Sequence, residues 1–250
     1  EHTDVHTVSL SAADVIGHQF GPNSKEILDY YTVLDKHIGA FISQLNESIG
    51  KNNYILVLTG DHGVAAMPEL LAEQGVDAKR IEGNQYDSDI DSIDHILQTQ
   101  FGLSESTISK KSYQGVEPNF EYLTSQGIDS VTYVDSLMTQ LKQLPYIAET
   151  YSFFDYHNNK CAKPYLDFMR NSFYPDFGYF IKILGKENYL VDMRSCGTTH
   201  GSPYTYDTHV PIVFYGSGNL TKSESSKVYT VDIVPTLWNM VYPQKSYTCD

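Results

Sequence analysis

The sequence predicts an α/β fold in which a sheet with flanking helices forms a core and an α+β subdomain is inserted into it. Two observations carry this prediction. A long amphipathic helix pattern is followed at once by a short, wholly apolar strand pattern. A later apolar strand and a C-terminal helix resume this pattern after a middle region of different character. We therefore assign residues 1–70 and 196–250 to the core and residues 71–195 to the insert.

The first part of the core is predicted to contain a strand, a helix and a second strand. Residues 5–11 (VHTVSLS) predict the first strand. Asn23 or Ser24 supplies a helix N-cap, and apolar residues at three- and four-residue spacing mark one buried helix face that continues to Ile49. The apolar run 54–59 (YILVLT) is typical of a strand buried in a parallel sheet. Together the three elements predict a βαβ unit.

The insert is predicted from an alternation of short elements. Helices are expected at residues 91–101 and 135–144, and strands near residues 130–134, 148–154 and 179–184. This alternation indicates an α+β layer beside the core. We expect the layer to shape access to the site without supplying metal ligands.

The core is predicted to resume after the insert. Residues 210–215 (VPIVFY) predict another strand, and residues 232–241 predict a helix with Pro235 in its first turn, where proline is tolerated. Polar clusters at residues 14–18 and 61–62 each follow a predicted strand. Open α/β sheets bind their ligands at the carboxyl ends of the strands, where these clusters are expected to lie.

Composition limits the classes of function. The 250 residues are 41% hydrophobic, which is enough to bury a substantial core. A formal charge of −14 argues against a nucleic-acid backbone as partner. It leaves room for a small phosphate ester, because bound metal ions supply positive charge locally. No run approaches the roughly 18 apolar residues of a membrane helix.

The three cysteines are Cys161, Cys196 and Cys249. They allow at most one disulfide within the chain, with Cys161–Cys196 as a candidate.

Five side chains are candidate metal ligands because carboxylate oxygen and imidazole nitrogen are ligands suited to zinc. A single structural zinc is held by four ligands, so five favour a two-metal site. The candidates are Asp14, His18, Asp61, His62 and His200.

Each cluster also has a purely structural interpretation. Asp14 and His18 alone are equally well explained as a helix cap and an ordinary loop histidine. Asp61 and His62 are more specific, because the flanking glycines allow a tight turn but do not explain a histidine there. His200 alone is best explained as a solvated loop residue. His209 is either a core histidine or a residue that holds a neighbouring ligand in place.

Three segments carry a resemblance to a known family. Residues 13–22 (ADVIGHQFGP) resemble a metal-binding segment of nucleotide pyrophosphatase/phosphodiesterases and related members of the alkaline phosphatase superfamily. Residues 59–63 (TGDHG) resemble the second metal segment of that superfamily. Residues 197–216 are similar to PafA-type bacterial alkaline phosphatases, and residues 230–237 match the helix that commonly follows. The resemblance implies part of an alkaline-phosphatase-like sheet.

The resemblance also implies roles for the five candidate ligands. Asp14, His18 and His200 are expected to bind the zinc that activates water. Asp61 and His62 are expected to bind a second zinc, which activates the nucleophile. The family's remaining metal-binding aspartate and its threonine or serine nucleophile are expected N-terminal to this chain, which leaves the second site incomplete. We therefore assign no nucleophile here, because Thr59, Thr198 and Thr199, the hydroxyls inside the motifs, lack the strand-to-helix context.

The implied function is that of the C-terminal portion of a periplasmic or secreted two-zinc phosphohydrolase. Such an enzyme cleaves phosphate monoesters through a threonine or serine phosphoenzyme. The partners expected are a small phosphate ester and the N-terminal half of the same protein, and the chain alone is expected to be inactive. The alternatives are a phosphodiesterase, a sulfatase-like hydrolase, or a non-catalytic metal-binding module that kept the ligands and lost the reaction.

Overall fold

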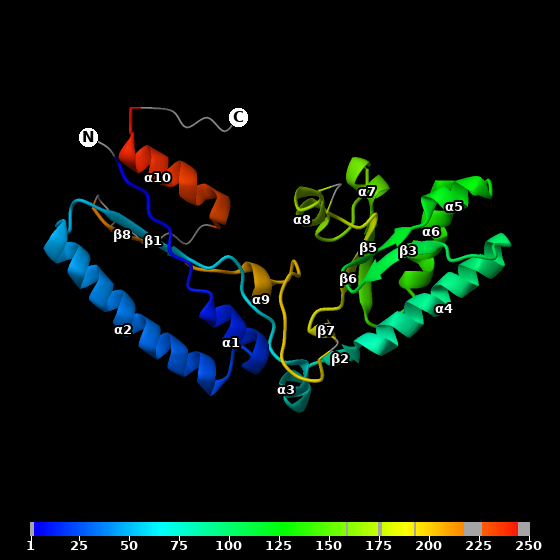
Figure 1. Ribbon diagram of the computed structural model, residues 1–250, viewed down its shortest axis with the longest axis horizontal. Helices are drawn as coiled ribbons and strands as arrows, with labels where there is room; N and C mark the ends of the chain where they lie inside the picture. Colours follow the sequence, from blue (N-terminus) through cyan, green and yellow to red (C-terminus); the bar gives the residue numbers. More distant parts are fainter. Residues whose placement is uncertain (1–2, 159, 175–176, 193, 218–226, 245–250) are drawn as a thin grey trace.

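The computed structural model describes residues 3–158, 160–174, 177–192, 194–217 and 227–244. These residues form two lobes that diverge from a common base (Figure 1). The first and last described segments, residues 3–11 and 227–244, lie in one lobe, the terminal lobe (Figure 1). Its elements are α1 (Ala12–Phe20), α2 (Lys25–Ser48), β1 (Ile55–Thr59), β8 (Ile212–Gly216), the short 3-10 helix η1 (Thr230–Asp232) and α10 (Ile233–Val241).

The second lobe, the central lobe, is built from the middle of the sequence. Its elements are β3 (Ile108–Ser112), β4 (Gly115–Pro118), β5 (Ile147–Ser152), β6 (Ile181–Gly185), α4 (Gly83–Phe101), α5 (Phe120–Ser125), α6 (Ser130–Leu141), α7 (Phe153–His157) and α8 (Leu166–Asn171). The base holds α3 (Pro68–Glu73), β2 (Lys79–Glu82), β7 (Tyr189–Asp192) and α9 (Thr205–Thr208). The predicted domain boundaries at residues 70 and 196 stay a prediction.

The long helix α2 matches its prediction because its capping and its period agree. The Ser24 hydroxyl accepts a hydrogen bond from the Ile27 amide at 3.2 Å and so satisfies one of the free amides of the first turn. The helix ends at Ser48, next to the predicted Ile49. Ile27 is its buried residue, whereas Tyr31 and Phe41 on the apolar stripe remain 52% and 47% exposed. The stripe is therefore only partly covered.

The strand predicted at residues 5–11 is wrong. Residues 3–10 have no regular structure, and Val5 and Val8 are 83% and 75% exposed. A β-strand needs a neighbour that completes its backbone hydrogen bonds, and no described segment pairs with these residues. The helix α1 begins at Ala12 instead. Asp14 and His18 therefore lie one turn apart on a helix rather than in a loop.

The parallel βαβ unit predicted at the start of the core is also wrong. β1 pairs with β8 in antiparallel register, with Ile55 opposite Gly216 and Thr59 opposite Ile212. Both strands lie where the sequence predicts strands, but Leu58 and Val213 are 39% and 48% exposed. An apolar run predicts a strand without specifying which strand it pairs with. The helix α10 follows its prediction closely.

The central lobe contains the larger of the two hydrophobic clusters of the described residues. Its antiparallel sheet has the strand order β3-β4-β6-β5, and α4 and α6 pack beside it. The cluster includes Ile90 and Leu97 of α4, Leu137 of α6, Val116 of β4 and Ile181 of β6. The predicted strands near residues 148–154 and 179–184 correspond to β5 and β6, and the predicted helices correspond to parts of α4 and α6.

The strand predicted at residues 130–134 is wrong, because this segment is the first turn of α6. The Asp129 side chain accepts a hydrogen bond from the Thr132 amide at 2.8 Å and caps the helix. Tyr133, Val134 and Leu137 then face the core at helical spacing, and each is 0% exposed. β-Branched residues suggested a strand, but the cap and the buried helical face decide the local structure.

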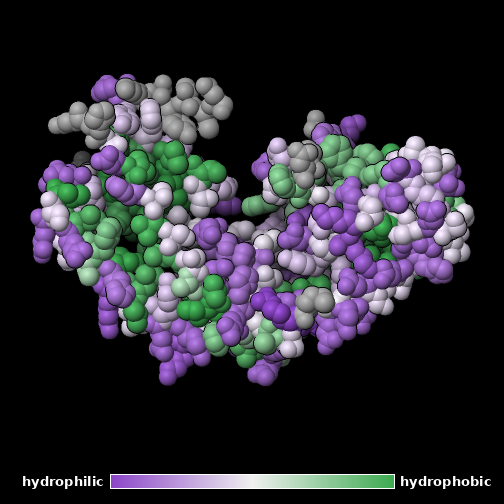
Figure 2. Space-filling model, in the orientation of Figure 1, coloured by the Kyte–Doolittle hydropathy of each residue, from purple (hydrophilic) through white to green (hydrophobic). Residues whose placement is uncertain are grey.

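The terminal lobe exposes much of its apolar surface. Leu28 of α2 is 65% exposed, and Val231 of η1 and Val234 at the start of α10 are 76% and 57% exposed. Figure 2 shows apolar residues gathered over this lobe, whereas the face of the central lobe is mostly hydrophilic. Among the described residues, no helix is long and apolar enough to cross a membrane.

The candidate disulfide between Cys161 and Cys196 is absent. Cys161 is half-buried and Cys196 is exposed, and both are free thiols, so they form no disulfide with each other. Cys249 lies outside the described residues.

Candidate metal centre

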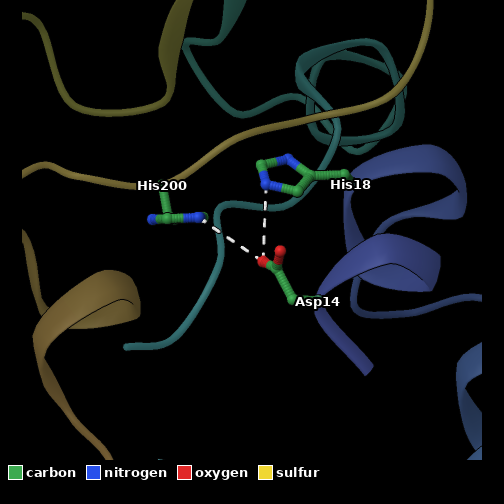
Figure 3. A group of neighbouring side chains, drawn as sticks. All are labelled: Asp14, His18 and His200. Carbon is green, nitrogen blue, oxygen red and sulfur yellow. Dashed lines mark ion pairs between the residues drawn. The ribbon is translucent and has the colours of Figure 1, made fainter. Parts of the chain in front are cut away.

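Asp14 lies at the centre of a group of imidazole nitrogens. Its Oδ1 is 3.4 Å from Nε2 of His18 and 3.5 Å from Nε2 of His200 (Figure 3). One ligand atom from each of the three residues lies within 4.8 Å of the others. Two ligands that each bind a zinc ion at about 2.0–2.1 Å with tetrahedral geometry are roughly 3.3 Å apart. The ligand types and their separations therefore fit a zinc ion.

His18 is held in the orientation that a metal ligand needs. Its Nδ1 donates a hydrogen bond to the Thr198 carbonyl at 2.8 Å, so the proton is on Nδ1 and the Nε2 lone pair faces Asp14. A backbone carbonyl on the distal ring nitrogen is the usual way in which a protein fixes the tautomer of a metal-binding histidine. The sequence separation is 180 residues, so the helix α1 and the loop before His200 are positioned together.

The chain passes close to α1 at Gly197. A Cβ atom at this position would lie 2.5 Å from the His18 carbonyl oxygen, and its φ of +86° is unfavourable for other residues. The glycine that begins the His200 motif therefore permits the backbone contact that places Thr198 against His18.

His62 brings the second cluster to the same place. Its Nδ1 donates to the Gly63 carbonyl at 2.8 Å, and its Nε2 is 3.8 Å from Asp14 Oδ1 and 3.7 Å from Asp61 Oδ2. The His62 ring stacks on the His200 ring, with centroids 3.4 Å apart. Asp61 is 89% exposed at its side chain. Asp14, His18, His62 and His200 thus lie in one group, and Asp61 is next to it through its contacts with His62.

Gly63 is required for a different reason from the predicted tight turn. A Cβ atom here would lie 2.1 Å from the Tyr206 carbonyl oxygen, and the Gly63 amide donates to the Asp207 carbonyl at 2.7 Å. Space for the α9 backbone, rather than turn geometry, excludes a side chain at this position. A Cβ atom at Gly60 would lie 3.4 Å from its nearest neighbours, which is an ordinary contact.

The electrostatic environment favours a neutral His200. Burial lowers the pKa of His200 below its ordinary value, and the neighbouring His62 and His18 lower it further, against the opposing effect of Asp14. A neutral imidazole carries the lone pair that a metal ion binds.

The chain as a whole is similar to known phosphodiesterases and phosphatases. The model of the family "type I phosphodiesterase / nucleotide pyrophosphatase" matches residues 1–119. The chain is 29% identical over 241 residues to alkaline phosphatase PafA of Elizabethkingia meningoseptica, which covers 96% of this chain and 43% of that protein. The crystal structure of wild-type PafA superposes with a TM-score of 0.81 at 26% identity over 92% of this chain and 43% of that one.

The chain belongs to the alkaline phosphatase superfamily. It is PafA-like and covers part of the length of its relatives. A protein of Myroides odoratus named as a calcium-transporting ATPase is 30% identical over 236 residues, which make up 94% of this chain and 42% of that protein. The chain thus spans less than half the length of these relatives. The small sheets described above correspond to part of the PafA structure.

The side chains of His209, Thr59 and Thr198 make no hydrogen bond to a candidate ligand among the described residues. His209 is exposed at the end of α9, and among the described residues its side chain makes no hydrogen bond to a candidate ligand. Its supporting role stays a prediction. The Thr59 hydroxyl donates to the Gly60 carbonyl at 3.2 Å, and the buried Thr198 hydroxyl donates to the Ala65 carbonyl at 2.9 Å. Both hydroxyls are engaged with backbone.

Sequence reasoning missed Asp207 as a residue of the site. It is 4% exposed, and one carboxylate oxygen accepts hydrogen bonds from the amide and hydroxyl of Ser202 at 2.8 and 2.6 Å. Its other oxygen, Oδ1, has no hydrogen-bond partner among the described groups. The negative charge of Asp207 acts to raise the pKa of His200. The signal in the sequence that could have pointed to Asp207 is its position shortly before the apolar strand at residues 210–215.

Sequence reasoning also missed two arginines, because neither lies inside a metal motif. Arg80 donates to the Gly197 carbonyl at 2.6 Å. Arg194 donates to the Thr198 carbonyl at 3.1 Å, the same oxygen that accepts from His18. Their contacts were hidden from the sequence because Arg80 and Gly197 are 117 positions apart.

Proposed function

We propose that this chain is the metal-binding C-terminal portion of a two-zinc phosphohydrolase that cleaves phosphate monoesters. The observation that carries the proposal is the position of Asp14 Oδ1, which lies 3.4 to 3.8 Å from the Nε2 atoms of three histidines. Superfamily membership and the likeness to PafA support the reaction class.

In this proposal Asp14, His18 and His200 hold one zinc ion, and Asp61 and His62 contribute to a second. Bound zinc lowers the pKa of water and polarises a phosphoryl oxygen. The protein's own side chains hold and orient the ligand atoms. His18 keeps its proton on Nδ1, bound to the Thr198 carbonyl, so Nε2 stays available as a ligand. The exposed Asp61 carboxylate accepts a hydrogen bond from the His62 amide at 3.1 Å through Oδ1, and its Oδ2 lies 3.7 Å from His62 Nε2.

The nucleophile is proposed to be a threonine or serine in the N-terminal half of the same protein. The chain spans 43% of the length of PafA, and the hydroxyls of Thr59 and Thr198 are bound to backbone carbonyls. The exposed apolar side chains of α2, β1, β8 and α10 support packing against that half. The resemblance to PafA-type enzymes supports a periplasmic or secreted location.

A phosphodiesterase is the second candidate function. The observation that favours it is the match of residues 1–119 to the type I phosphodiesterase family. The two candidates differ in the charge of the substrate, because a monoester carries one more negative charge than a diester and needs an additional cationic or hydrogen-bonding group.

The test is an assay of the intact protein with a phosphate monoester and a phosphodiester in the presence of zinc. We expect saturable turnover of the monoester with the higher kcat/KM, lost in His18→Ala and His200→Ala. His157→Ala is the matched control, since His157 is an exposed histidine of α7. Preference for the diester would establish the second candidate. Zinc binding without turnover of either ester would establish a non-catalytic module.

A further inference from the structure

The side chain of Arg80 occupies a junction at the base of the two lobes. Its guanidinium forms a two-pronged contact with Glu69 of α3, with Nε to Oε1 at 2.6 Å and Nη2 to Oε2 at 3.0 Å. Nη2 also donates to the Gly197 carbonyl at 2.6 Å, and Nη1 is 3.9 Å from Asp192 Oδ2. Only 8% of the Arg80 side chain is exposed.

The groups around Arg80 lie on the chain segments that carry the candidate ligands. Glu69 follows the segment of His62, and Gly197 precedes His200 by three residues in the sequence. These two segments also contact each other directly. The Thr198 hydroxyl donates to the Ala65 carbonyl at 2.9 Å, and the Ala65 amide donates to the Thr199 carbonyl at 3.3 Å. Arg80 therefore joins the segment after the second cluster to the loop before His200.

The loop formed by residues 194–200, here called the His200 loop, has a second guanidinium contact. Arg194 donates to both oxygens of Asp192 and, at 3.1 Å, to the Thr198 carbonyl that orients His18. Asp192 ends β7, which pairs in parallel with β2, the strand that carries Arg80. The contacts form a continuous path from β2 through the His200 loop to the ring of His18.

We propose that Arg80 is a positioning residue that fixes the His200 loop and thereby sets the zinc affinity of the Asp14–His18–His200 group. This inference rests on the metal site of the proposed function. A buried arginine can bind the Glu69 carboxylate and the Gly197 carbonyl at once because its guanidinium presents several donors in one plane. A lysine ammonium is a point donor and cannot reproduce this fork.

The test compares Arg80→Met and Arg80→Lys in the intact protein with Asp94→Ala. Asp94 of α4 is a matched control, because it is a buried charged residue whose hydrogen-bond partners Ser106 and Thr107 precede β3 in the central lobe and are not part of the His200 loop. Two readouts are used. The first is amide hydrogen exchange of residues 194–200 in the metal-free protein, and the second is zinc affinity measured by competition with a chelator.

We expect both Arg80 variants to raise exchange in the His200 loop and to weaken zinc binding by about 10- to 100-fold, the usual effect of losing a group that supports a ligand. Asp94→Ala should lower thermal stability without changing either readout. Unchanged exchange in the His200 loop of Arg80→Met, or an equal change in Asp94→Ala, would overturn the inference. Absence of zinc binding in the wild-type protein would contradict the proposed function, and the exchange measurement would still decide the role of Arg80.

Discussion

His18 and Thr198 bind each other at two points. The His18 ring donates to the Thr198 carbonyl at 2.8 Å, and the Thr198 amide donates to the His18 carbonyl at 2.8 Å. The second bond satisfies a carbonyl in the last turn of α1, which has no partner within the helix. This reciprocal pair attaches the helix that carries Asp14 to the loop that carries His200, so the geometry of the site depends on the tertiary fold.

Loss of the His18 ring should weaken zinc binding more strongly than loss of any supporting group. His18→Ala removes both a ligand atom and the contact with the Thr198 carbonyl, so the affinity should fall by more than the roughly 10- to 100-fold typical of supporting residues. Zinc titration of the metal-free protein measures this affinity. His157→Ala should leave the affinity unchanged, and an equal loss in both variants would refute the assignment of His18.

Gly63 and Gly60 should differ sharply in their tolerance of a side chain. Gly63→Ala places a methyl group against the Tyr206 carbonyl and forces the α9 backbone away, whereas the Cβ of Gly60→Ala meets only ordinary contacts. We expect Gly63→Ala to lose about 2 kcal/mol or more of stability together with zinc affinity, and Gly60→Ala to lose less than about 1 kcal/mol. Urea unfolding and zinc titration check this, and similar losses in both variants would contradict it.

Asp94 should stabilise the central lobe. Its carboxylate accepts hydrogen bonds from the Ser106 hydroxyl and from both the amide and the hydroxyl of Thr107, a residue that is 0% exposed. Asp94→Ala leaves the buried amide and hydroxyl of Thr107 without this acceptor and should cost about 3 kcal/mol. Asp87→Ala, at an exposed position of the same helix, should change stability by less than about 0.5 kcal/mol. Equal urea midpoints for the two variants would count against this network.

Asp155 should make stability depend on acid pH. Burial raises its pKa, but the hydrogen bonds from Lys163 and from the Ser152 amide outweigh burial, so the pKa lies below its ordinary value. Its carboxylate form therefore stabilises the folded state above the unfolded-state pKa of about 4, and this contribution is lost as pH falls through the lower folded-state pKa. Between pH 7 and pH 3, wild type should lose more stability than Asp155→Asn. Parallel losses in urea unfolding would exclude this role.

The apolar stripe of α2 should tolerate charge in the isolated chain but not in the intact protein. Phe41 is 47% exposed here, so Phe41→Asp should have a small effect on the chain alone. If the N-terminal half covers the stripe, the same change should cost about 3 kcal/mol or more in the intact protein, with loss of solubility. Ser43→Asp, an exposed position roughly opposite Phe41 on the helix, is the control. A harmless Phe41→Asp in the intact protein would show that the stripe is not covered.

Local signals were sufficient for some elements. The helix α2 followed from a cap and a consistent apolar period, and the strands β1 and β8 and the helix α10 followed from continuous apolar runs. The sequence also pointed to five candidate ligands, because each lies in a short motif with its own glycines; their role as ligands stays a prediction. The strand prediction for residues 130–134 was wrong, because β-branched composition is a weaker determinant of local structure than a helix cap and a buried helical face.

The sequence by itself determined which residues supply the candidate ligands, which segments are strongly helical or extended, and to which superfamily the motifs belong. Only the tertiary structure decided that β1 pairs antiparallel with β8, that His62 stacks on His200, and that Gly63 makes room for the α9 backbone. It also placed Arg80 against Gly197. The physical reason is that these contacts join residues far apart in the chain, and local propensity carries no information about which distant groups meet.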